Sequence, residues 1–250
     1  ADVDVTKEPI PIIPTVHYNM GGIPTNFHGE VMTTVNGDES PIEGLMAAGE
    51  AACVSVHGAN RLGSNSLIDL VVFGKAASDR INDTVKKGEP NKDIPQSVID
   101  EVINRFDATR HSNGSNPTAE LRNKMQKVMQ NHCAVFRDEE IMSEGKKLIE
   151  DIWLQSSDIN VKDKSLIWNT DLLETLEFQN LISQAVVTML SAYNRKESRG
   201  AHARDDFTER DDKNWMVHTL AWAHNNNCTL DYRPVHTYTL SNEVKYIEPK

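Results

Sequence analysis

The sequence predicts an α+β protein in which a segment of strands and one helix precedes an antiparallel helical bundle and a small unit that contains a β-hairpin. Within residues 57–77 a glycine-bracketed loop runs into an amphipathic helix. Between residues 93 and 193 apolar residues recur at helical spacing in separate stretches. From residue 215 the apolar pattern alternates on either side of an asparagine-rich turn. We therefore expect domains over residues 1–87, 93–205 and 206–250.

The first domain offers a candidate ligand site at the end of a predicted strand. Residues 44–53 form a short apolar run through Gly49-Glu50 that is typical of a buried strand. Ligands of open α/β sheets bind at the carboxyl ends of strands, which makes Glu50 a candidate acceptor for ligand hydroxyls. A solvated loop carboxylate is the simpler alternative. His17 lies in an extended segment before a Gly-Gly turn, and a lone histidine there is more often structural than a ligand contact.

A helix is predicted directly after the loop of residues 57–63. Its apolar or small residues at helical spacing are Leu67, Leu70, Val71, Gly74 and Ala77. Residues 64–66 supply capping side chains, and the exposed N–H groups of a helix start favour an anionic ligand group. Arg61 adds a planar fork of donors that matches a carboxylate, although an arginine packed on a surface turn fits the spacing equally well. Gly74 predicts close approach of another backbone, that of the strand near Glu50.

The second domain is predicted to begin after the polar, breaker-rich linker of residues 86–92. Helix starts are expected at residues 93–96, at Asn116-Pro117 and at Asp171, the last with a capping box. The predicted core stripes are Val98, Val102 and Phe106; Leu121, Met125, Val128, Met129, His132 and Phe136; Ile141, Gly145, Leu148 and Ile152; and the apolar stretch 181–190. Short connections between neighbouring helices favour an antiparallel bundle.

The third domain is predicted from alternation of apolar and polar residues. Residues 215–222 and 229–232 are expected to form strands joined by a turn at residues 225–227. Just upstream, residues 195–206 form a dense charged string. We interpret this string as a brace between domains or a docking site for a partner, with a solvated surface as the alternative.

Composition narrows the class of protein. The chain has 250 residues, of which 38% are hydrophobic, enough to bury a core. A net charge of −11 argues against nucleic acid or anionic lipid as the main partner. Cys53, Cys133 and Cys228 are too scattered for a disulfide framework or a zinc site, so we expect no metal and a reducing compartment. No apolar stretch approaches the roughly 20 residues of a membrane span.

Four strings taken together are more specific than any single motif. In order along the chain they are PTVHYNMGGIPTN, GEAACVSVHGANRLGSNSLIDLVVFGKAA, SLIWNTDLLETLE and RKESRGAHARDDF. They closely resemble the succinate dehydrogenase group of the succinate dehydrogenase/fumarate reductase flavoprotein family, from Pro9 to about Tyr246. The family's G-x-G-x-x-G segment, covalent flavin histidine and proton-abstracting arginine have no counterpart here. The chain therefore resembles only the C-terminal part, and residues 1–87 are expected to be the end of an FAD-binding α/β domain.

The resemblance implies a chemistry and assigns residues to it. Family members of this group oxidise succinate to fumarate by hydride transfer to FAD, and electrons pass to an iron–sulfur subunit and then to quinone. His17 and Arg61 match the family's substrate contacts. Glu50 matches a flavin contact, at the ribityl chain, and Ser66 and Leu67 match the backbone pair at the helix start that faces the flavin pyrimidine edge. The catalytic arginine and the residue for covalent FAD attachment lie outside this chain.

The resemblance also implies partners and a location, and it leaves alternatives open. We expect an iron–sulfur subunit, membrane-anchor subunits contacted indirectly, and a peripheral position on the cytoplasmic face of a bacterial inner membrane or the matrix face of the mitochondrial one. A fumarate reductase or an L-aspartate oxidase is the alternative enzyme, and the Arg-Gly-Ala-His string and residues 233–235 favour succinate dehydrogenase. A non-catalytic helical docking module is the alternative if the chain is naturally this short. Alone, the chain is predicted to be inactive.

Overall fold

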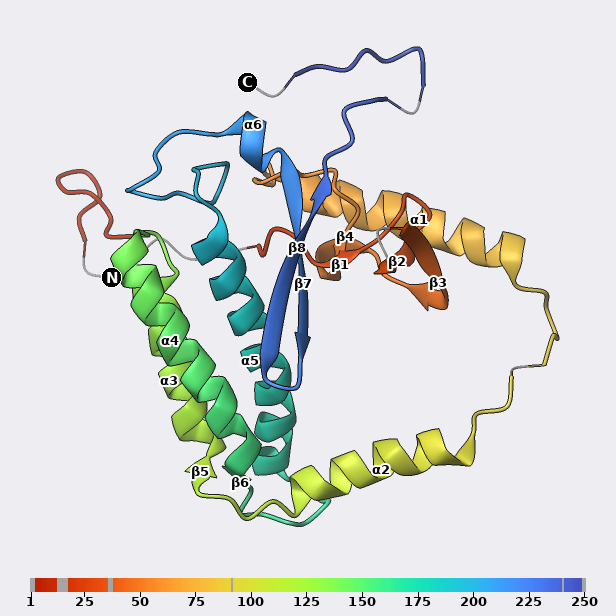
Figure 1. The fold of residues 1–250 in the computed structure, drawn as a ribbon, viewed down its shortest axis with the longest axis vertical. Coiled ribbons are helices and arrows are strands. Elements are labelled where there is room, and N and C mark those ends of the chain that lie inside the picture. Colours follow the sequence, from red (N-terminus) through yellow and green to blue (C-terminus); the bar gives the residue numbers. More distant parts are fainter. Residues whose placement is uncertain (1–2, 13–17, 36–37, 91, 240, 249–250) are drawn as a thin grey trace. The chain divides into compact units, whose positions relative to one another are not determined.

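A computed structural model of the chain describes residues 3–12, 18–35, 38–90, 92–239 and 241–248. It mixes helices and strands, in agreement with the predicted α+β class (Figure 1). The chain divides into two compact units, residues 1–93 and 94–250, and each is described by itself.

The first unit holds two small sheets. Strand β1 (Ile23–Pro24) pairs in parallel with β4 (Ala52–Cys53), and β2 (Glu30–Val35) pairs antiparallel with β3 (Asp38–Met46). The predicted single strand over residues 44–53 is wrong, because β3 ends at Met46 and a short 3-10 helix, η1 (Gly49–Ala51), intervenes. Gly49 has a φ of +75°, a left-handed conformation that interrupts an extended strand.

Helix α1 (Asn65–Thr84) follows and packs on this unit through its side chains. A Cβ added to Gly49 would collide with the Leu70 side chain, so the helix lies directly against η1. Arg80 Nε donates to Glu30 Oε1 at 2.7 Å and ties the helix to β2. The predicted role of Gly74 is wrong, since a Cβ added there meets no described atom within 4 Å.

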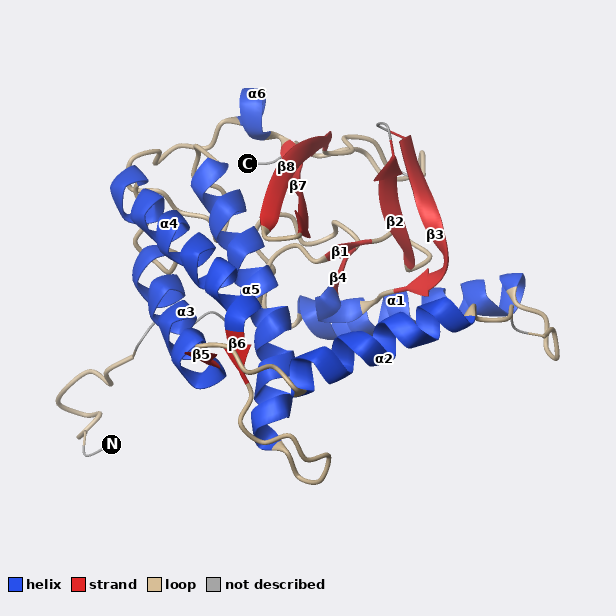
Figure 2. Ribbon diagram, turned by 60° about the horizontal axis from the view of Figure 1, so that its bottom comes forward, coloured by secondary structure: helices blue, strands red, loops and turns tan. Residues whose placement is uncertain are grey.

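The second unit contains the helical bundle. Its helices are α2 (Gln96–Arg110), α3 (Thr118–His132), α4 (Glu139–Gln155) and α5 (Thr170–Asn194), and α3, α4 and α5 pack against one another (Figure 2). The most deeply buried apolar side chains are Leu121, Met142, Ile149, Val161, Phe178, Ile182, Val186 and Met189. A Cβ on Gly145 would collide with His132, so α3 and α4 approach closely there.

Three predicted core stripes need correction, and one of them is Val98, Val102 and Phe106 in α2, which are exposed. Phe136 lies beyond the end of α3 and is 73% exposed. In α4 the predicted Gly145 and Ile152 are buried, but Met142 and Ile149 are buried in place of the predicted Ile141 and Leu148, and Leu148 is 38% exposed. Helix α2 buries none of its described side chains. The predicted stripes have the correct period, but the packing of neighbouring helices selects which adjacent apolar face becomes the core.

The chain reaches a β-hairpin after the short helix α6 (Asp212–Trp215). Strands β7 (Val217–His224) and β8 (Asn227–Pro234) pair antiparallel, with Val217 opposite Pro234 and His224 opposite Asn227. The turn residues Asn225 and Asn226 have φ values of 49° and 56°, as the tightest hairpin turns require. The predicted hairpin is present, but Trp215 belongs to α6 rather than to the first strand. Short strands β5 (Asn116–Pro117) and β6 (Ile159–Asn160) pair in parallel beside the bundle.

Candidate functional site

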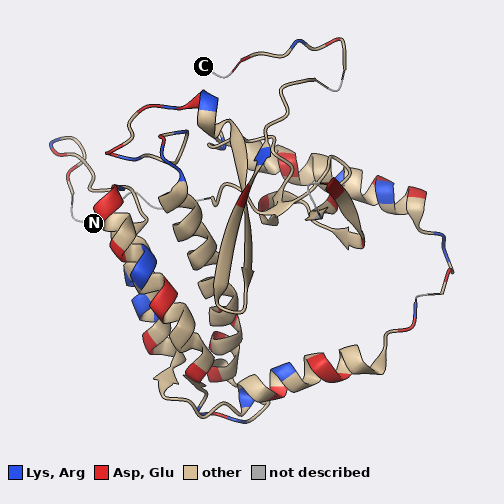
Figure 3. Cartoon of the chain, viewed as in Figure 1, with Lys and Arg blue, Asp and Glu red and all other residues tan. Residues whose placement is uncertain are grey.

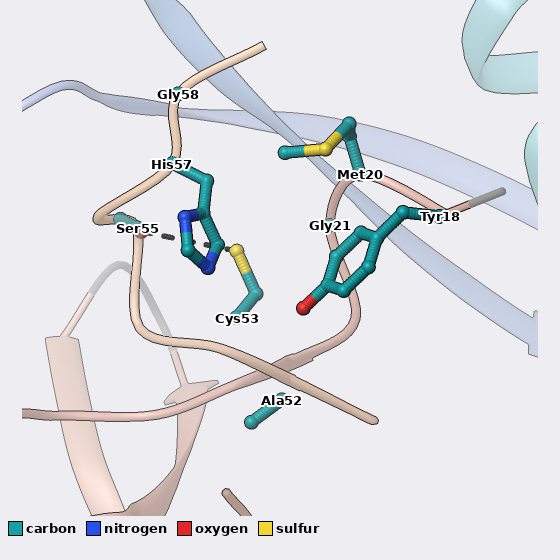
Figure 4. A pocket seen from close by; sticks show the side chains of 8 residues that line it. All are labelled: Tyr18, Met20, Gly21, Ala52, Cys53, Ser55, His57 and Gly58. Carbon is teal, nitrogen blue, oxygen red and sulfur yellow. Dashed lines mark hydrogen bonds between the residues drawn. The ribbon is translucent and has the colours of Figure 1, made fainter. Parts of the chain in front are cut away.

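A small pocket in the first unit lies where β4 ends and the chain turns toward α1 (Figure 4). Its lining residues are Tyr18, Met20, Gly21, Ala52, Cys53, Ser55, His57 and Gly58. The two segments that form it are close together, because a Cβ added to Gly22 would lie 2.7 Å from the Ala51 carbonyl oxygen. None of the predicted site residues Glu50, Arg61, Ser66 and Leu67 is among the residues that line this pocket.

The loop between this pocket and α1 is closed by a buried pair. His57 Nε2 lies 2.8 Å from Asp69 Oδ2, and their side chains are only 13% and 5% exposed. An ionised carboxylate only accepts hydrogen bonds, so the imidazole Nε2–H donates to Asp69. The pair joins the first residue of the loop to the second turn of α1 and fixes the path of the chain between them.

Arg61 lies inside this loop and stacks on an aromatic ring. Its Cζ atom is 4.7 Å from the centroid of the Tyr18 ring, and Nη1 donates to the Leu62 carbonyl at 3.1 Å. The Nε atom of Arg61 is buried and has no hydrogen-bond partner among the residues that the structure describes. Burial raises the pKa of the Tyr18 hydroxyl, and the Asp69 carboxylate adds to that shift, so the hydroxyl stays protonated.

The other predicted site residues have different surroundings. Glu50 is exposed in η1, and its charge also contributes to the raised pKa of Tyr18. Ser66 and Leu67 occupy the first turn of α1, where the Leu67 N–H donates to the Ser64 carbonyl at 3.1 Å. His17 lies outside the described residues.

The start of α1 differs from the expected capping. Ser64 precedes the helix in a left-handed conformation with a φ of 66°, and its side chain makes no capping hydrogen bond, so the predicted side-chain cap is wrong. The first turn carries no acidic residue, so no side-chain charge there neutralises the positive end of the helix dipole. Residues Tyr18 and Asp69 were not predicted as site residues. The only signal for Asp69 was a lone carboxylate among the apolar residues of the helix.

The charged string in the second unit forms a second cluster of titratable side chains, in the loop between α5 and α6 (Figure 3). Glu197 is fully buried and accepts from Arg195 at 2.7 Å, from Arg199 at 2.8 and 3.0 Å, and from the Asp211 N–H at 2.8 Å. Burial alone would raise the pKa of Glu197, but the hydrogen bonds, that from Arg199 first, outweigh it and lower that pKa. The carboxylate is therefore ionised and fully paired.

Arg204 and His202 complete this cluster. Arg204 is 1% exposed and binds Asp206 with two hydrogen bonds of 2.8 and 2.6 Å. His202 Nδ1 accepts from Arg137 Nη1 at 2.8 Å, so its Nε2–H donates to the Arg195 carbonyl at 3.1 Å. Burial lowers the pKa of His202 to about 4. The cluster is thus a closed network with its donors and acceptors matched to one another.

No group of three histidine, cysteine, aspartate or glutamate side chains in the described ranges is placed to hold a metal ion. None of the helices in that part of the chain combines the length and the apolar character needed to cross a membrane.

Comparison with known proteins identifies the family. Residues 122–250 match the family described as fumarate reductase flavoprotein C-term, and residues 1–67 match the FAD binding domain family. All of the chain aligns, at 57% identity, with 40% of the mitochondrial succinate dehydrogenase [ubiquinone] flavoprotein subunit of Oryza sativa. It aligns at 55% identity with 42% of the succinate dehydrogenase flavoprotein subunit of Rickettsia bellii.

A solved structure agrees with the sequence relatives. A mutant E. coli quinol fumarate reductase superposes with a TM-score of 0.83 and 36% identity over 99% of this chain and 42% of that chain. The chain spans about two fifths of the length of these relatives. With one family match over more than half of its residues and another over the part that holds the pocket, the chain belongs to the succinate dehydrogenase/fumarate reductase flavoprotein family.

Proposed function

We propose that this chain is the C-terminal part of a flavoprotein that oxidises succinate to fumarate. The observation that carries the proposal is the buried Nε atom of Arg61, which has no hydrogen-bond partner among the described residues. A buried N–H without a partner costs about 1–3 kcal/mol, and a ligand carboxylate that accepts from it removes that cost. The chain covers 40% of a succinate dehydrogenase relative, so the proton-abstracting arginine and the covalent flavin attachment belong to the rest of such a protein.

Arg61 is proposed to clamp one substrate carboxylate. Its guanidinium stacks on the Tyr18 ring by one face, which leaves the edge of its plane available for two parallel hydrogen bonds to a carboxylate. His17, which directly precedes Tyr18, is proposed to donate a hydrogen bond to the same substrate. Two contacts on a short dicarboxylate fix the position of its methylene groups, and this positioning accounts for a large part of the rate in such reactions.

The start of α1 and η1 are proposed to contact FAD. The FAD binding domain match over residues 1–67 ends in the first turn of α1, and that turn carries no opposing acidic residue. We propose that the backbone of Ser66 and Leu67 faces the pyrimidine edge of the flavin, and that the exposed Glu50 carboxylate accepts from ribityl hydroxyls. The Leu67 N–H also donates to the Ser64 carbonyl, so in this proposal the flavin and Ser64 share that donor. When bound, FAD accepts the hydride that leaves succinate.

The proposal also includes partner subunits and a location in the cell. We propose that an iron–sulfur subunit takes the electrons and that membrane-anchor subunits are reached through it, at the cytoplasmic face of a bacterial inner membrane or the matrix face of the mitochondrial one. Support comes from relatives named as ubiquinone-linked subunits and from a neighbour named as a quinol fumarate reductase. The division at residues 1–87, 93–205 and 206–250 remains our proposal for the domains.

Binding of a non-reactive dicarboxylate tests the proposed function directly. In a complete flavoprotein that contains these 250 residues, we expect malonate to bind at least 100-fold more weakly after Arg61→Ala, because the carboxylate loses a bidentate partner. Propionate, with a single carboxylate, should bind weakly to both proteins. Malonate affinity unchanged by Arg61→Ala would show that Arg61 is not the substrate clamp.

The chain by itself gives a second test. We expect the purified 250-residue chain to hold no stoichiometric flavin and to leave succinate unoxidised, because the dinucleotide-binding strand and the catalytic arginine are elsewhere. Absorbance near 450 nm and a dye-reduction assay measure the two properties. A yellow preparation that turns over succinate would contradict our placement of the missing parts.

A further inference from the structure

We propose that Asp69, His57 and Tyr18 are positioning residues that hold the Arg61 guanidinium ready for its carboxylate. These side chains form one continuous set of contacts in the first unit: Asp69 to His57, His57 to Tyr18, and Tyr18 to Arg61. We call this set the arginine brace. The inference rests on the proposed function, since it concerns how the substrate-binding arginine is held.

The first step concerns the loop that carries Arg61. Ser55, Gly58 and Ser64 all have left-handed backbone, with φ values of 68°, 61° and 66°, and two of them are not glycine. Such backbone is costly for residues with a side chain and persists only where the surroundings fix it. The buried hydrogen bond of 2.8 Å between His57 and Asp69 joins the two sides of this loop and supplies that constraint. The pair therefore determines the conformation from which Arg61 projects.

The second step concerns the ring that lies between the pair and the arginine. Tyr18 meets the His57 ring edge to face, with centroids 6.0 Å apart and planes at 77°, and carries Arg61 over its own ring at 4.7 Å. A guanidinium stacked on an aromatic ring loses rotational freedom but keeps its in-plane donors. Tyr18 therefore restricts the orientation of the Arg61 guanidinium and leaves its in-plane donors available for a carboxylate.

The third step concerns the state of Arg61 without a ligand. Its one hydrogen bond among the described residues is a local one, from Nη1 to the neighbouring Leu62 carbonyl, and the buried Nε has none. Its own hydrogen bonds therefore do not fix its orientation in this unit. The stacking on Tyr18, supported by the buried pair behind it, is the contact that does so. Preorganisation of this kind raises ligand affinity because less side-chain entropy is lost on binding.

The test uses the complete flavoprotein and separates positioning from general stability. For Asp69→Asn, which keeps the shape and removes the charge, we expect the Kd of malonate and the KM for succinate to rise about tenfold, with kcat at saturating succinate and flavin content nearly unchanged. Asp79→Asn is the matched control, because Asp79 lies on the same helix, is exposed and forms an ion pair with the exposed Lys75. A control variant that raised the Kd equally would overturn the proposal.

A double-mutant cycle shows whether Asp69 acts through Arg61. In an Arg61→Ala background we expect Asp69→Asn to have no additional effect on malonate binding, since the residue that it positions is gone. Tyr18→Leu, which removes the stacking face, should raise the malonate Kd and show the same non-additivity. Additive effects, or loss of flavin together with malonate binding in Asp69→Asn, would overturn the brace. A different result would contradict the proposed function: malonate affinity that is unchanged by Arg61→Ala itself.

Discussion

Arg61 in the first unit, which is half-buried, and Arg204 in the second, which is fully buried, show two different uses of a guanidinium. Arg204 is 1% exposed, and its donors reach Asp206, Glu139 and the Tyr193 carbonyl. Arg61 is half-buried, and its Nε has no partner in the described part of the chain. An arginine whose donors are met inside the protein stabilises the fold, whereas one with a buried free donor is suited to an acceptor from outside.

The environments of the two arginines explain the difference. Arg204 is part of a network in which each buried acid has a matching base, and the pKa of Asp206 is lowered, above all by its hydrogen bonds with Arg204. Arg61 has an aromatic ring beneath it and no carboxylate bonded to it among the described residues. Within the described ranges, the buried side-chain donors of the first arrangement are all matched, whereas the second leaves the Arg61 Nε without a partner. Substitutions in the two regions should therefore separate stability from activity.

The largest effect is expected in the second unit. Glu197→Ala leaves Arg195 and Arg199 without their shared buried carboxylate, and loss of one member of a buried ion pair costs about 3–5 kcal/mol. Urea denaturation of the chain measures the free energy of unfolding. The exposed Glu209, replaced in Glu209→Ala, is the control and should change stability by less than about 0.5 kcal/mol. A small effect of Glu197→Ala would show that the network contributes little to the fold.

Next in size is a change that keeps the charge of Arg61. Arg61→Lys loses the planar fork, so we expect kcat/KM for succinate in the complete flavoprotein to fall about 100-fold, equal to about 2.7 kcal/mol of transition-state binding. The free energy of unfolding should stay within about 0.5 kcal/mol, because the fold does not use the free donor. If Arg61→Lys instead lowered the free energy of unfolding and left kcat/KM unchanged, Arg61 would stabilise the fold, as Arg204 does.

A smaller effect follows from His202. Its folded pKa of about 4 lies below the ordinary value of 6.5, so the fold favours the neutral ring, and its contribution is complete above pH 6.5 and lost as the pH falls toward 4. Between pH 7.5 and pH 5 this amounts to a loss of about 2 kcal/mol. Urea melts at several pH values measure it, and His202→Gln should flatten the curve over this interval. An unchanged curve would assign the pH dependence to other groups.

The smallest effect is a gain in stability. Since a Cβ on Gly74 meets no described atom within 4 Å, Gly74→Ala should stabilise α1 by about 1 kcal/mol through helix propensity alone. Thermal melts of the chain measure the change. Gly49→Ala is the contrasting variant, because its Cβ would collide with Leu70 on a backbone that already has positive φ, and it should destabilise. A destabilising Gly74→Ala would restore the close packing expected from the sequence.

Periodicity in the sequence predicted the long helices and the hairpin well. The helix expected from Asp171 is α5, which begins at Thr170, and the asparagine turn has the left-handed backbone that a tight hairpin needs. These features depend on neighbouring residues alone. The strand expected over residues 44–53 was wrong because Gly49 adopts a left-handed conformation that no apolar count reveals. In α4 the predicted Gly145 and Ile152 are buried, but Met142 and Ile149 replace Ile141 and Leu148, because contact with α3 and α5 selects the buried face.

The candidate site was predictable in one part and not in another. Arg61 was identified from its place between a glycine loop and a helix, which is a local feature. Tyr18 and Asp69 were not, since their contacts with Arg61 and His57 join segments far apart in the chain. The roles of His17, Arg61, Glu50, Ser66 and Leu67 all remain predictions.

The contact between Leu70 and Gly49 has a consequence for the assembly of the flavin surface. Leu70 lies one turn after Ser66, and Gly49 directly precedes Glu50, so the packing of α1 on η1 holds both proposed flavin contacts beside each other. The conformational entropy of bringing these contacts together is then lost during folding rather than during cofactor capture. Hydrogen exchange in the first turn of α1 and in η1 should accordingly report a single local opening event, shared by both segments.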